Sequence, residues 1–372
     1  MPFGKEPLMN VGVIGAGIIS EIYLKNMTRL FPNLTVLGVA ARHPERARAR
    51  ASQFGIRAYT VEELLADPQV ELVVILTPVG THYDLIRRAL LAGKHVYTEK
   101  TLADSLDKAR QLCALAEETG LCLGSAPDTF LGSALQCARQ AVDRGLLGQI
   151  NSFAISVHRN NSYLLSRYPF LLEPGAGVLL DFCVYHVTAL ASLFGPFARV
   201  GGIVSTPYPT HTCTLPGPDF GKILRSPNES QVSAVLQTRG GVTGTLHLDA
   251  ESNTRGEPFF TLYGTEGILR LPDPNRFGGQ VLFCPNSSEG EQPPIALPQT
   301  TPYRENSRGV GPAEMAQAIA EGRPCRASKE MALHVLEVLT TLLEVGKAGG
   351  FGTVATDFSR PTPLPEAGIG GP

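Results

Sequence analysis

The amino-acid sequence predicts two domains: an N-terminal α/β domain with a parallel sheet over residues 1–127, and an α+β domain with an open, mostly antiparallel sheet over residues 128–372. Three observations predict this organisation. The chain of 372 residues is longer than the roughly 100–200 residues of a usual domain. Short apolar runs alternate with helix-period segments as far as Ser125. Beyond Pro127, several strands follow one another with short turns.

The composition is that of a globular protein without a strong charge bias, at 43% hydrophobic and 18% charged residues with a formal net charge of −2. This balance argues against nucleic acid or an anionic membrane surface as a partner, because such partners select clustered Lys and Arg. No apolar run approaches the roughly 18 residues of a membrane helix, and the first residues lack a signal pattern. The seven cysteines form no CxxC pair, so we expect reduced thiols and a cytoplasmic protein.

The first domain alternates five buried strands with five helices. The strands, rich in Val, Ile and Leu, are expected at residues 11–14, 34–40, 72–76, 95–98 and 121–124. The helices are expected at residues 19–30, 44–54, 61–66, 81–92 and 104–119. Alternation of this kind predicts a parallel sheet that is covered by helices on both faces.

The second domain has a different pattern, in which strands mostly follow strands. Helices are expected at residues 132–145, 178–194, 313–321 and 329–347. Strands are expected at residues 149–158, 200–205, 230–238, 242–249, 259–263, 268–271 and 281–284. The polar segment after residue 158 is expected to be irregular, and the Gly- and Pro-rich tail from Gly349 to be extended.

A glycine-rich loop joins the first strand to the first helix and predicts nucleotide binding. Gly15 permits a tight turn, and Gly17 allows the backbone to approach a pyrophosphate. Ile18 and Ile19 then open the helix, whose free N–H groups attract negative charge. Placed after the first strand of an alternating domain, this G-x-G-x-x-Ser pattern predicts a dinucleotide-binding domain of the Rossmann type.

The end of the second strand bears on the choice between NAD and NADP. An NAD-binding domain usually carries a carboxylate there, about 20 residues past the loop, to hold the ribose hydroxyls. The sequence instead has Ala41 followed by Arg42, whose guanidinium can bind a 2′-phosphate. We therefore expect NADP or NAD, with NADP favoured, although Arg42 is also explained as a solvated surface charge.

Four further segments are similar to the motifs of a known family: residues 76–82 (LTPVGTH), 93–100 (GKHVYTEK), 175–185 (GAGVLLDFCVY) and 263–267 (YGTEG). By these motifs, which extend over nearly the whole chain, the protein resembles the Gfo/Idh/MocA oxidoreductases. The resemblance implies a Rossmann domain, a second domain whose open sheet serves substrate binding and oligomerisation, and hydride transfer to or from NAD(P). It also implies a sugar, cyclitol, glycoside or dihydrodiol as the substrate.

In the nucleotide domain, the matching positions assign cofactor binding to Thr77, Pro78, His82, Glu99 and Lys100. The family's Glu-Lys-Pro is Glu-Lys-Thr here, which keeps the charged pair and loses the proline.

In the second domain, the family's Asp-x-Gly-x-[His/Tyr] becomes Asp181-x-Cys183-x-Tyr185. The acid–base position therefore holds tyrosine, as in the glucose–fructose oxidoreductase and dimeric dihydrodiol dehydrogenase branches.

Four residues are candidates for the chemistry. Removing a hydroxyl proton during hydride transfer needs a base, and a nearby ammonium favours the phenolate of a tyrosine. We therefore predict Tyr185 as the acid–base group and Lys100 as the cation that lowers its pKa and binds the reacting oxygen. Asp181, four residues before Tyr185 on the predicted helix, would orient substrate hydroxyls. His186 is a second candidate base, although it points about 100° away from Tyr185 on a regular helix.

Polar residues at the domain junction and after strand 149–158 are weaker candidates for substrate binding. They are Asp128, His158, Asn160 and Tyr163, in addition to Asp181. The histidines and cysteines show no metal-ligand spacing, so we expect no metal site.

Two alternatives to a simple dehydrogenase stay open on the sequence. One is a glycoside-cleaving enzyme that oxidises, eliminates and re-reduces with tightly held NAD, and the other is a non-catalytic NAD(P)-binding sensor. In either case the ligand is a small carbohydrate-like molecule. We expect a homodimer or homotetramer formed through the second sheet, whose exposed face would otherwise be sticky.

Overall fold

A computed structural model describes residues 9–173, 175–252, 259–287, 290 and 292–369. The chain forms two compact units. Unit 1 contains Met1–Gln136, Thr300–Leu333 and Pro361–Pro372, and unit 2 contains Cys137–Gln299 and His334–Arg360. Whereas the sequence predicts two continuous segments that meet near residue 127, two later stretches of chain belong to unit 1.

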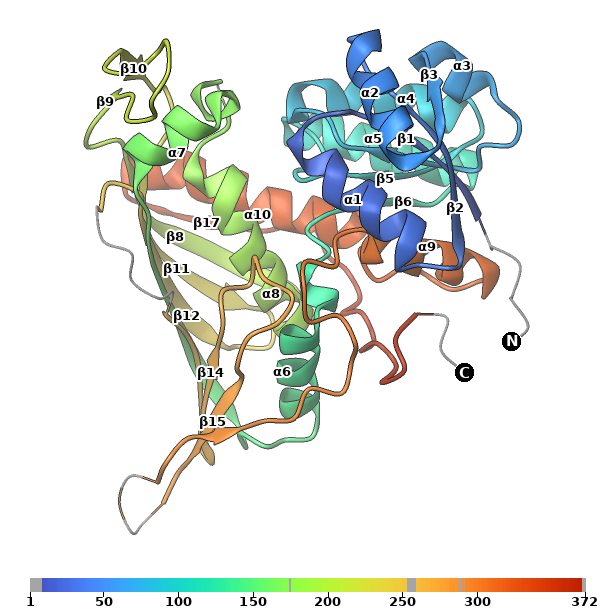
Figure 1. The fold of residues 1–372 in the computed structure, drawn as a ribbon. Helices are drawn as coiled ribbons and strands as arrows, with labels where there is room; N and C mark the ends of the chain where they lie inside the picture. The colour runs from blue at the N-terminus through green and yellow to red at the C-terminus, as the bar shows by residue number, and fades with distance from the viewer. Residues whose placement is uncertain (1–8, 174, 253–258, 288–289, 291, 370–372) are drawn as a thin grey trace. The chain divides into compact units, whose positions relative to one another are not determined.

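Unit 1 is built on a six-stranded parallel sheet with strand order β3-β2-β1-β4-β5-β6 (Figure 1). Its strands are β1 (Met9–Ile14), β2 (Leu34–Ala40), β3 (Arg57–Tyr59), β4 (Leu72–Ile75), β5 (His95–Thr98) and β6 (Leu123–Ser125). This is the strand order of a dinucleotide-binding Rossmann fold. The expected parallel sheet is confirmed, and the strand that the sequence missed, β3, has only three residues and begins with Arg.

The first five helices of unit 1 agree with the sequence to within one or two residues, and the sixth begins three residues before its expected start. They are α1 (Ile18–Arg29), α2 (Pro44–Phe54), α3 (Val61–Ala66), α4 (His82–Leu91) and α5 (Leu106–Thr119), with α9 (Val310–Ala320) from the later part of the chain. The ends of α5 have clear causes, since the Ser105 side chain accepts a hydrogen bond from the Lys108 N–H and Gly120 is left-handed. Along the sheet, α1 lies beside α2, and α4 beside α5.

Unit 2 is built on a nine-stranded sheet with order β16-β15-β14-β13-β7-β12-β11-β8-β17. Its strands are β7 (Ile150–His158), β8 (Phe197–Ser205), β11 (Gln231–Thr238), β12 (Thr243–Asp249), β13 (Phe259–Gly264), β14 (Gly267–Leu271), β15 (Leu282–Pro285), β16 (Ile295–Ala296) and β17 (Phe351–Thr353). β7 and β12 run parallel and the other neighbours antiparallel, which confirms the expected mostly antiparallel sheet. A separate hairpin pairs β9 (Thr210–Thr212) with β10 (Ile223–Arg225).

Two local expectations in unit 2 are wrong. The segment after β7 is not irregular but contains α7 (Asn161–Arg167), because the Asn160 side chain accepts a hydrogen bond from the Tyr163 N–H and caps the helix. The helix expected from residue 178 begins with a π-turn (Leu179–Cys183), and only then continues as α8 (Val184–Phe194). The remaining helices, α6 (Ser133–Asp143) and α10 (Lys329–Ala348), both contain a boundary between the units.

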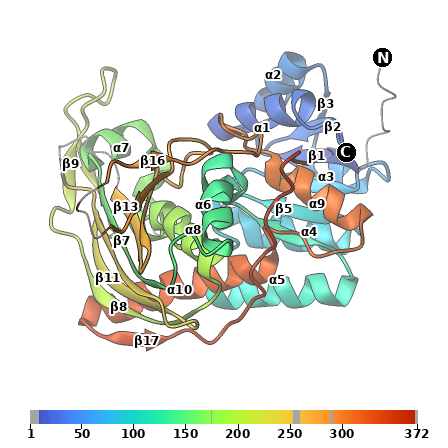
Figure 2. The same ribbon diagram turned by 90° about the horizontal axis from the view of Figure 1, so that it is seen from below.

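The two faces of the nine-stranded sheet differ in character. On one face, Phe153 of β7 stacks on Phe194 of α8 with ring centroids 6.4 Å apart, and Figures 1 and 2 show α8 against this face. On the other face, apolar side chains are exposed on the neighbouring strands β11, β8 and β17 and on the more distant β13: Val235, Ile203, Phe351 and Phe259. Self-association through this face stays a prediction.

The C-terminal tail is extended, as the sequence predicts, and its end is tied to unit 1. The Arg326 guanidinium donates to the carbonyls of Thr362 at 2.8 Å and Pro363 at 3.0 Å. The same guanidinium pairs with buried Glu314 at 2.6 Å, which fixes its orientation. Together with the hydrogen bonds of the Leu364 N–H to Gln136 and of the Ile369 N–H to Tyr303, these contacts bind the end of the tail to unit 1.

Within the described ranges, no helix has the combination of length and apolar character that crossing a bilayer requires. The seven cysteines are all free thiols.

Candidate active site

The glycine loop of unit 1 has the geometry that a dinucleotide requires. Gly15 has φ of 122°, and a Cβ there would lie 2.6 Å from the Leu76 carbonyl oxygen, so only glycine fits. Gly17 is the N-cap of α1 and is exposed, and a Cβ there would have no atom within 4 Å. The first N–H groups of α1 have no capping side chain at Gly17, at the switch point between β1 and β4. These residues fit the pyrophosphate of NAD(P).

The residues after Gly17 divide into exposed and buried ones. Ile18 is 72% exposed and Ile19 is half-buried, so Ile18 presents an apolar surface beside the loop. Ser20 is buried, and its hydroxyl donates to the Gly17 carbonyl at 2.7 Å. A larger residue at position 20 would push α1 away from the sheet. A small residue is therefore needed here, where a third glycine often stands, and serine is small enough.

An arginine from α2 supports this loop and is not identifiable from the sequence. The Arg50 guanidinium bonds to Glu21 of α1 at 2.9 Å and approaches the Gly17 carbonyl at 3.4 Å. Its spacing from the loop in sequence carries no known signal, because the contact depends on how α2 packs beside α1.

Ala41 and Arg42 lie at the same edge of the sheet as the loop. Ala40, the last residue of β2, pairs with Ile14, the last residue of β1. Ala41 is half-buried and Arg42 is exposed. The carboxyl end of β2 therefore presents a guanidinium, and no carboxylate, next to the loop.

The segment after β4 contains the cofactor candidates Thr77, Pro78 and His82. Thr77 is half-buried and Pro78 exposed, which leaves both near the surface at the carboxyl end of the strand. His82 is different, because it is fully buried and cannot contact a bound cofactor directly. Its Nδ1 lies 2.7 Å from the Thr101 carbonyl oxygen, and its Nε2 lies 2.9 Å from that of Thr77.

His82 therefore joins the loop after β4 to the loop after β5. Burial lowers the pKa of His82, whereas the two carbonyls and the Glu99 carboxylate act in the opposite direction. A neutral imidazole donates one hydrogen bond and a protonated one donates two, so the carbonyl pair favours the charged form. The role that the structure supports for His82 is to position the two loops.

Glu99 and Lys100 follow β5, and both are half-buried. The Tyr23 hydroxyl donates to Glu99 Oε1 at 2.8 Å, and the Lys100 N–H donates to Glu99 Oε2 at 3.2 Å. The Glu99 carboxylate is thus held on both oxygens, and it fixes the backbone from which the Lys100 side chain projects. The peptide bond between Lys100 and Thr101 is cis. Burial, followed by the charge of Glu99, raises the pKa of Tyr23.

The candidates of unit 2 lie at the start of α8. Asp181 is half-buried within the π-turn, and Tyr185 is 8% exposed in the first turn of α8. His186 is 1% exposed, and burial lowers its pKa to about 4. An imidazole with that pKa is neutral and weakly basic near pH 7, which argues against His186 as the acid–base group.

Asn228 and Glu229, which precede β11, hold the glycine turn before Asp181. Asn228 accepts a hydrogen bond from the Gly175 N–H at 3.0 Å and donates to the Leu171 carbonyl at 2.9 Å. Glu229 Oε1 accepts from the Leu179 N–H at 2.9 Å, and its carboxylate occupies the space that a Cβ at Gly177 would need.

These contacts explain why residue 177 is glycine and where the π-turn starts. The pair was not found from the sequence, because about 50 residues separate it from the turn.

The side chains of β7 point alternately to the two faces of the sheet, and this decides the direction of the candidate His158 at its end. The His158 ring lies 5.7 Å from that of His247 of β12 and within 3.3 Å of the Ser156 hydroxyl, on the open face of the sheet. Because Val157 and Phe153 face the helices, His158 points away from α8 and does not line a site with Asp181.

Asn160 and Tyr163 have different roles. The Asn160 side chain is used as the cap of α7, and Tyr163 is exposed on that helix.

Asp128, expected to contact ligand, is instead a buried backbone acceptor. It is 1% exposed, and its Oδ2 accepts from the N–H groups of Gly309 at 3.0 Å and Gly311 at 3.2 Å. It thereby holds the start of α9, where the first N–H groups of a helix need acceptors. Burial raises its pKa from the ordinary 3.8 to about 6.

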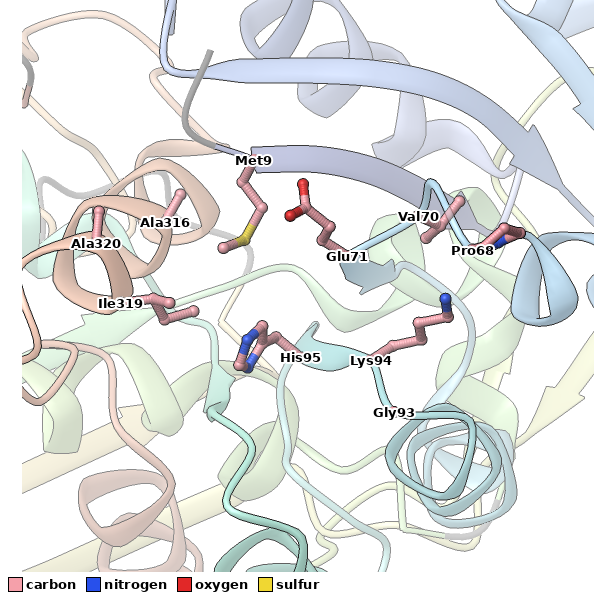
Figure 3. Close-up of a pocket in the computed structure, with 10 residues that line it drawn as sticks. All are labelled: Met9, Pro68, Val70, Glu71, Gly93, Lys94, His95, Ala316, Ile319 and Ala320. Carbon is pink, nitrogen blue, oxygen red and sulfur yellow. The ribbon is translucent and has the colours of Figure 1, made fainter. Parts of the chain in front are cut away.

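A cavity of about 330 Å³ lies at the opposite edge of the parallel sheet, at the amino ends of β1, β4 and β5 (Figure 3). Two of its charged groups already bond to backbone: Glu71 accepts from the Asn10 N–H at 2.8 Å, and Lys94 donates to the Asp67 carbonyl at 2.8 Å. Ligands of such sheets bind at the carboxyl ends, so this cavity is separate from the candidate active site. In the described residues, no group of three or more His, Cys, Asp or Glu side chains is arranged to hold a metal ion.

Comparison with known proteins agrees with this geometry. Residues 9–126 match the family model described as "Oxidoreductase family, NAD-binding Rossmann fold", and residues 135–270 match the model "GFO/IDH/MocA C-terminal domain". The chain belongs to the Gfo/Idh/MocA oxidoreductase family. It is an NAD(P)-dependent oxidoreductase with a Rossmann domain and a mostly antiparallel second domain.

Relatives in the family are named dehydrogenases and reductases. The chain is 35% identical over 273 residues to dTDP-3,4-didehydro-2,6-dideoxy-alpha-D-glucose 3-reductase of Streptomyces violaceoruber, covering 71% of this chain and 72% of the relative. It is 28% identical over 350 residues to trans-1,2-dihydrobenzene-1,2-diol dehydrogenase of Bos taurus, covering 91% and 96%. Levoglucosan dehydrogenase in complex with NADH has the same fold, with a TM-score of 0.81 at 22% identity over 94% of this chain and 99% of that one.

Asp128→Asn should change how stability depends on pH. Because the pKa of Asp128 is raised in the folded protein, the folded state binds the proton more tightly, and the carboxyl costs stability as pH rises above its unfolded pKa. Between about pH 5 and pH 7, the variant should gain about 1 kcal/mol relative to the natural protein. Urea unfolding at both pH values measures this, with exposed Asp84→Asn as control. A difference between variant and natural protein that is independent of pH would contradict the assignment.

Glu229→Ala should loosen the π-turn, because the buried Leu179 N–H would lose its acceptor. We expect a loss of about 1–3 kcal/mol in the free energy of unfolding, and faster hydrogen exchange in the peptide that contains Leu179. Glu229→Gln keeps an acceptor oxygen and should lose less. Exposed Glu173→Ala, in the adjoining loop, is the control. Equal effects of Glu229→Ala and Glu173→Ala would show that the carboxylate does not hold this turn.

Proposed function

We propose that the protein transfers a hydride between a nicotinamide and a hydroxyl or ketone carbon of a sugar, glycoside, cyclitol or related polyol. The observation that carries this proposal is the exposed turn at Gly17, where the first N–H groups of α1 have no side-chain cap in a sheet with Rossmann strand order. The names of the relatives support the substrate class, since a dideoxy sugar, a dihydrodiol and levoglucosan all offer a carbinol or ketone carbon.

The residues that we assign to the reaction are Lys100, Asp181 and Tyr185. Tyr185 takes or returns the hydroxyl proton, and Lys100 stabilises the oxygen on which negative charge develops. Asp181 accepts hydrogen bonds from neighbouring substrate hydroxyls. When bound, the nicotinamide accepts or supplies the hydride.

One rival activity is glycoside cleavage by oxidation, elimination and re-reduction with a retained cofactor. It uses the same kind of site, but it returns the cofactor to its starting state. Measuring net formation of NAD(P)H during product formation separates the two, since only a dehydrogenase converts cofactor in proportion to product.

Tyr185→Phe and Lys100→Ala should each lower kcat/KM by a factor of about 10²–10⁴, because each removes a group assigned to proton transfer or charge stabilisation. Absorbance of reduced cofactor, with levoglucosan, myo-inositol and aldoses as test substrates, measures turnover. Tyr163→Phe, at an exposed tyrosine of α7, and Lys108→Ala, at a lysine paired with Asp104, are matched controls. Full turnover in both site variants would refute the mechanism.

For the cofactor, we propose NADP, because Ala41 stands where an NAD-binding domain usually has a carboxylate, and Arg42 follows it. Arg42→Ala should raise the Kd of NADPH by about tenfold and leave that of NADH within about twofold. The chain has no tryptophan, so the fluorescence of the reduced cofactor reports binding without that background. Arg46→Ala, an exposed residue of α2, is the control. Tighter binding of NADH than of NADPH by the natural protein would reverse this choice.

A further inference from the structure

Arg159 is the residue next to His158, and it points to the other face of the sheet. Its backbone N–H donates to the Asp249 carbonyl at 2.8 Å, which continues the pairing of β7 with β12 by one residue. Successive side chains of a strand point to opposite faces, so Arg159 faces the helices where His158 faces away from them. Its guanidinium carbon lies 4.1 Å from the ring centroid of Phe182.

The ring beneath this guanidinium belongs to the candidate active site. Phe182 follows Asp181 in the π-turn, and its ring lies 5.3 Å from that of His186 and 6.2 Å from that of Tyr185. The aromatic cluster is buried and holds Phe182 in place. Arg159 is therefore a cation fixed by stacking beside the turn that carries the assigned catalytic side chains.

Within the described residues, the Arg159 guanidinium has a ring contact but no hydrogen bond or ion pair. The Asp249 carboxylate lies on the other face with His158, 4.0 Å from the His158 ring nitrogen, and accepts from the Ser252 hydroxyl at 2.5 Å. The guanidinium thus keeps its five N–H donors available to a ligand.

A guanidinium that is stacked and unpaired is suited to one kind of ligand group. Its planar fork matches the two oxygens of a carboxylate or phosphate, and stacking has already restricted its rotation. A neutral polyol has hydroxyl groups that can donate hydrogen bonds to the Asp181 carboxylate, and it has no charge for a guanidinium to bind.

We infer that Arg159 binds an oxyanion of the substrate, so that the preferred substrate is an acidic sugar carrying a carboxylate or a phosphate. The inference rests on the proposed function for the hydride transfer itself. It adds the charge of the substrate and the residue that selects it.

The test compares matched neutral and acidic substrates. Glucose with glucuronate, galactose with galacturonate, and glucose with glucose 6-phosphate are assayed with NAD and NADP. The natural protein should prefer an acidic substrate over its neutral match by at least tenfold in kcat/KM. Whether the carboxylates or the phosphate give the larger preference identifies the oxyanion.

Arg159→Gln should abolish that preference by raising the KM of the acidic substrate, and should leave kcat/KM for the neutral sugar within about twofold. Arg159→Lys, which keeps a cation over the ring, should retain part of the preference. Arg199→Gln, at an exposed residue of β8, is the control and should change nothing.

A binding measurement keeps this inference distinct from the proposed function. Calorimetric titration of glucuronate, galacturonate and glucose 6-phosphate into the protein with saturating cofactor should give binding that Arg159→Gln weakens at least tenfold. Binding of this kind without turnover of any sugar would sink the proposed function and leave the anion site standing. Turnover of neutral sugars with equal kcat/KM for acidic ones, unchanged in Arg159→Gln, would overturn the anion site and leave the function standing.

Discussion

The parallel arrangement of the strands in unit 1 is the constraint on which the nucleotide half of the site depends. Because β1, β2, β4 and β5 all run in the same direction, their carboxyl ends meet at one edge. That edge receives the glycine loop, Arg42, the Thr77 segment and the Glu99–Lys100 pair. The chain connects these segments over some 90 residues, and only the sheet brings them together.

The edge is held by polar side chains whose hydrogen-bond partners are other groups of the protein. His82 joins two loops through their carbonyls, and Glu99 is held by Tyr23 and by the N–H of Lys100. Asp128 holds the start of α9 in the same way. A buried polar group needs partners, and where the partners are backbone groups of a loop, the group fixes that loop.

Unit 2 uses the same device at the start of α8. Asn228 and Glu229 bind the glycine turn, and the π-turn that follows carries Asp181. The π-turn also places Phe182 under Arg159, which connects the end of β7 to the helix. The side chains assigned to chemistry are therefore few, and a larger set of buried groups determines their direction.

The sequence by itself determined the fold class, nearly every strand and helix of unit 1, and the glycine loop. These depend on hydrophobic periodicity, on caps and on glycine conformation, all of which act over a few residues. The sequence also led to Lys100, Asp181 and Tyr185 through the resemblance of their motifs.

The tertiary structure decided which polar residues face a site and which support it. The sequence predicts Asp128 and His82 as ligand-binding residues, but in the structure both are buried and bond to backbone groups. The sequence could not show this, because burial depends on the packing of distant segments such as α9 and the loop at Thr101. His158 and Arg159 differ by one position, and the alternation of β7 sends them to opposite faces. Which face is covered by α8 is set by the long-range packing of the sheet, and no local pattern in the sequence records it.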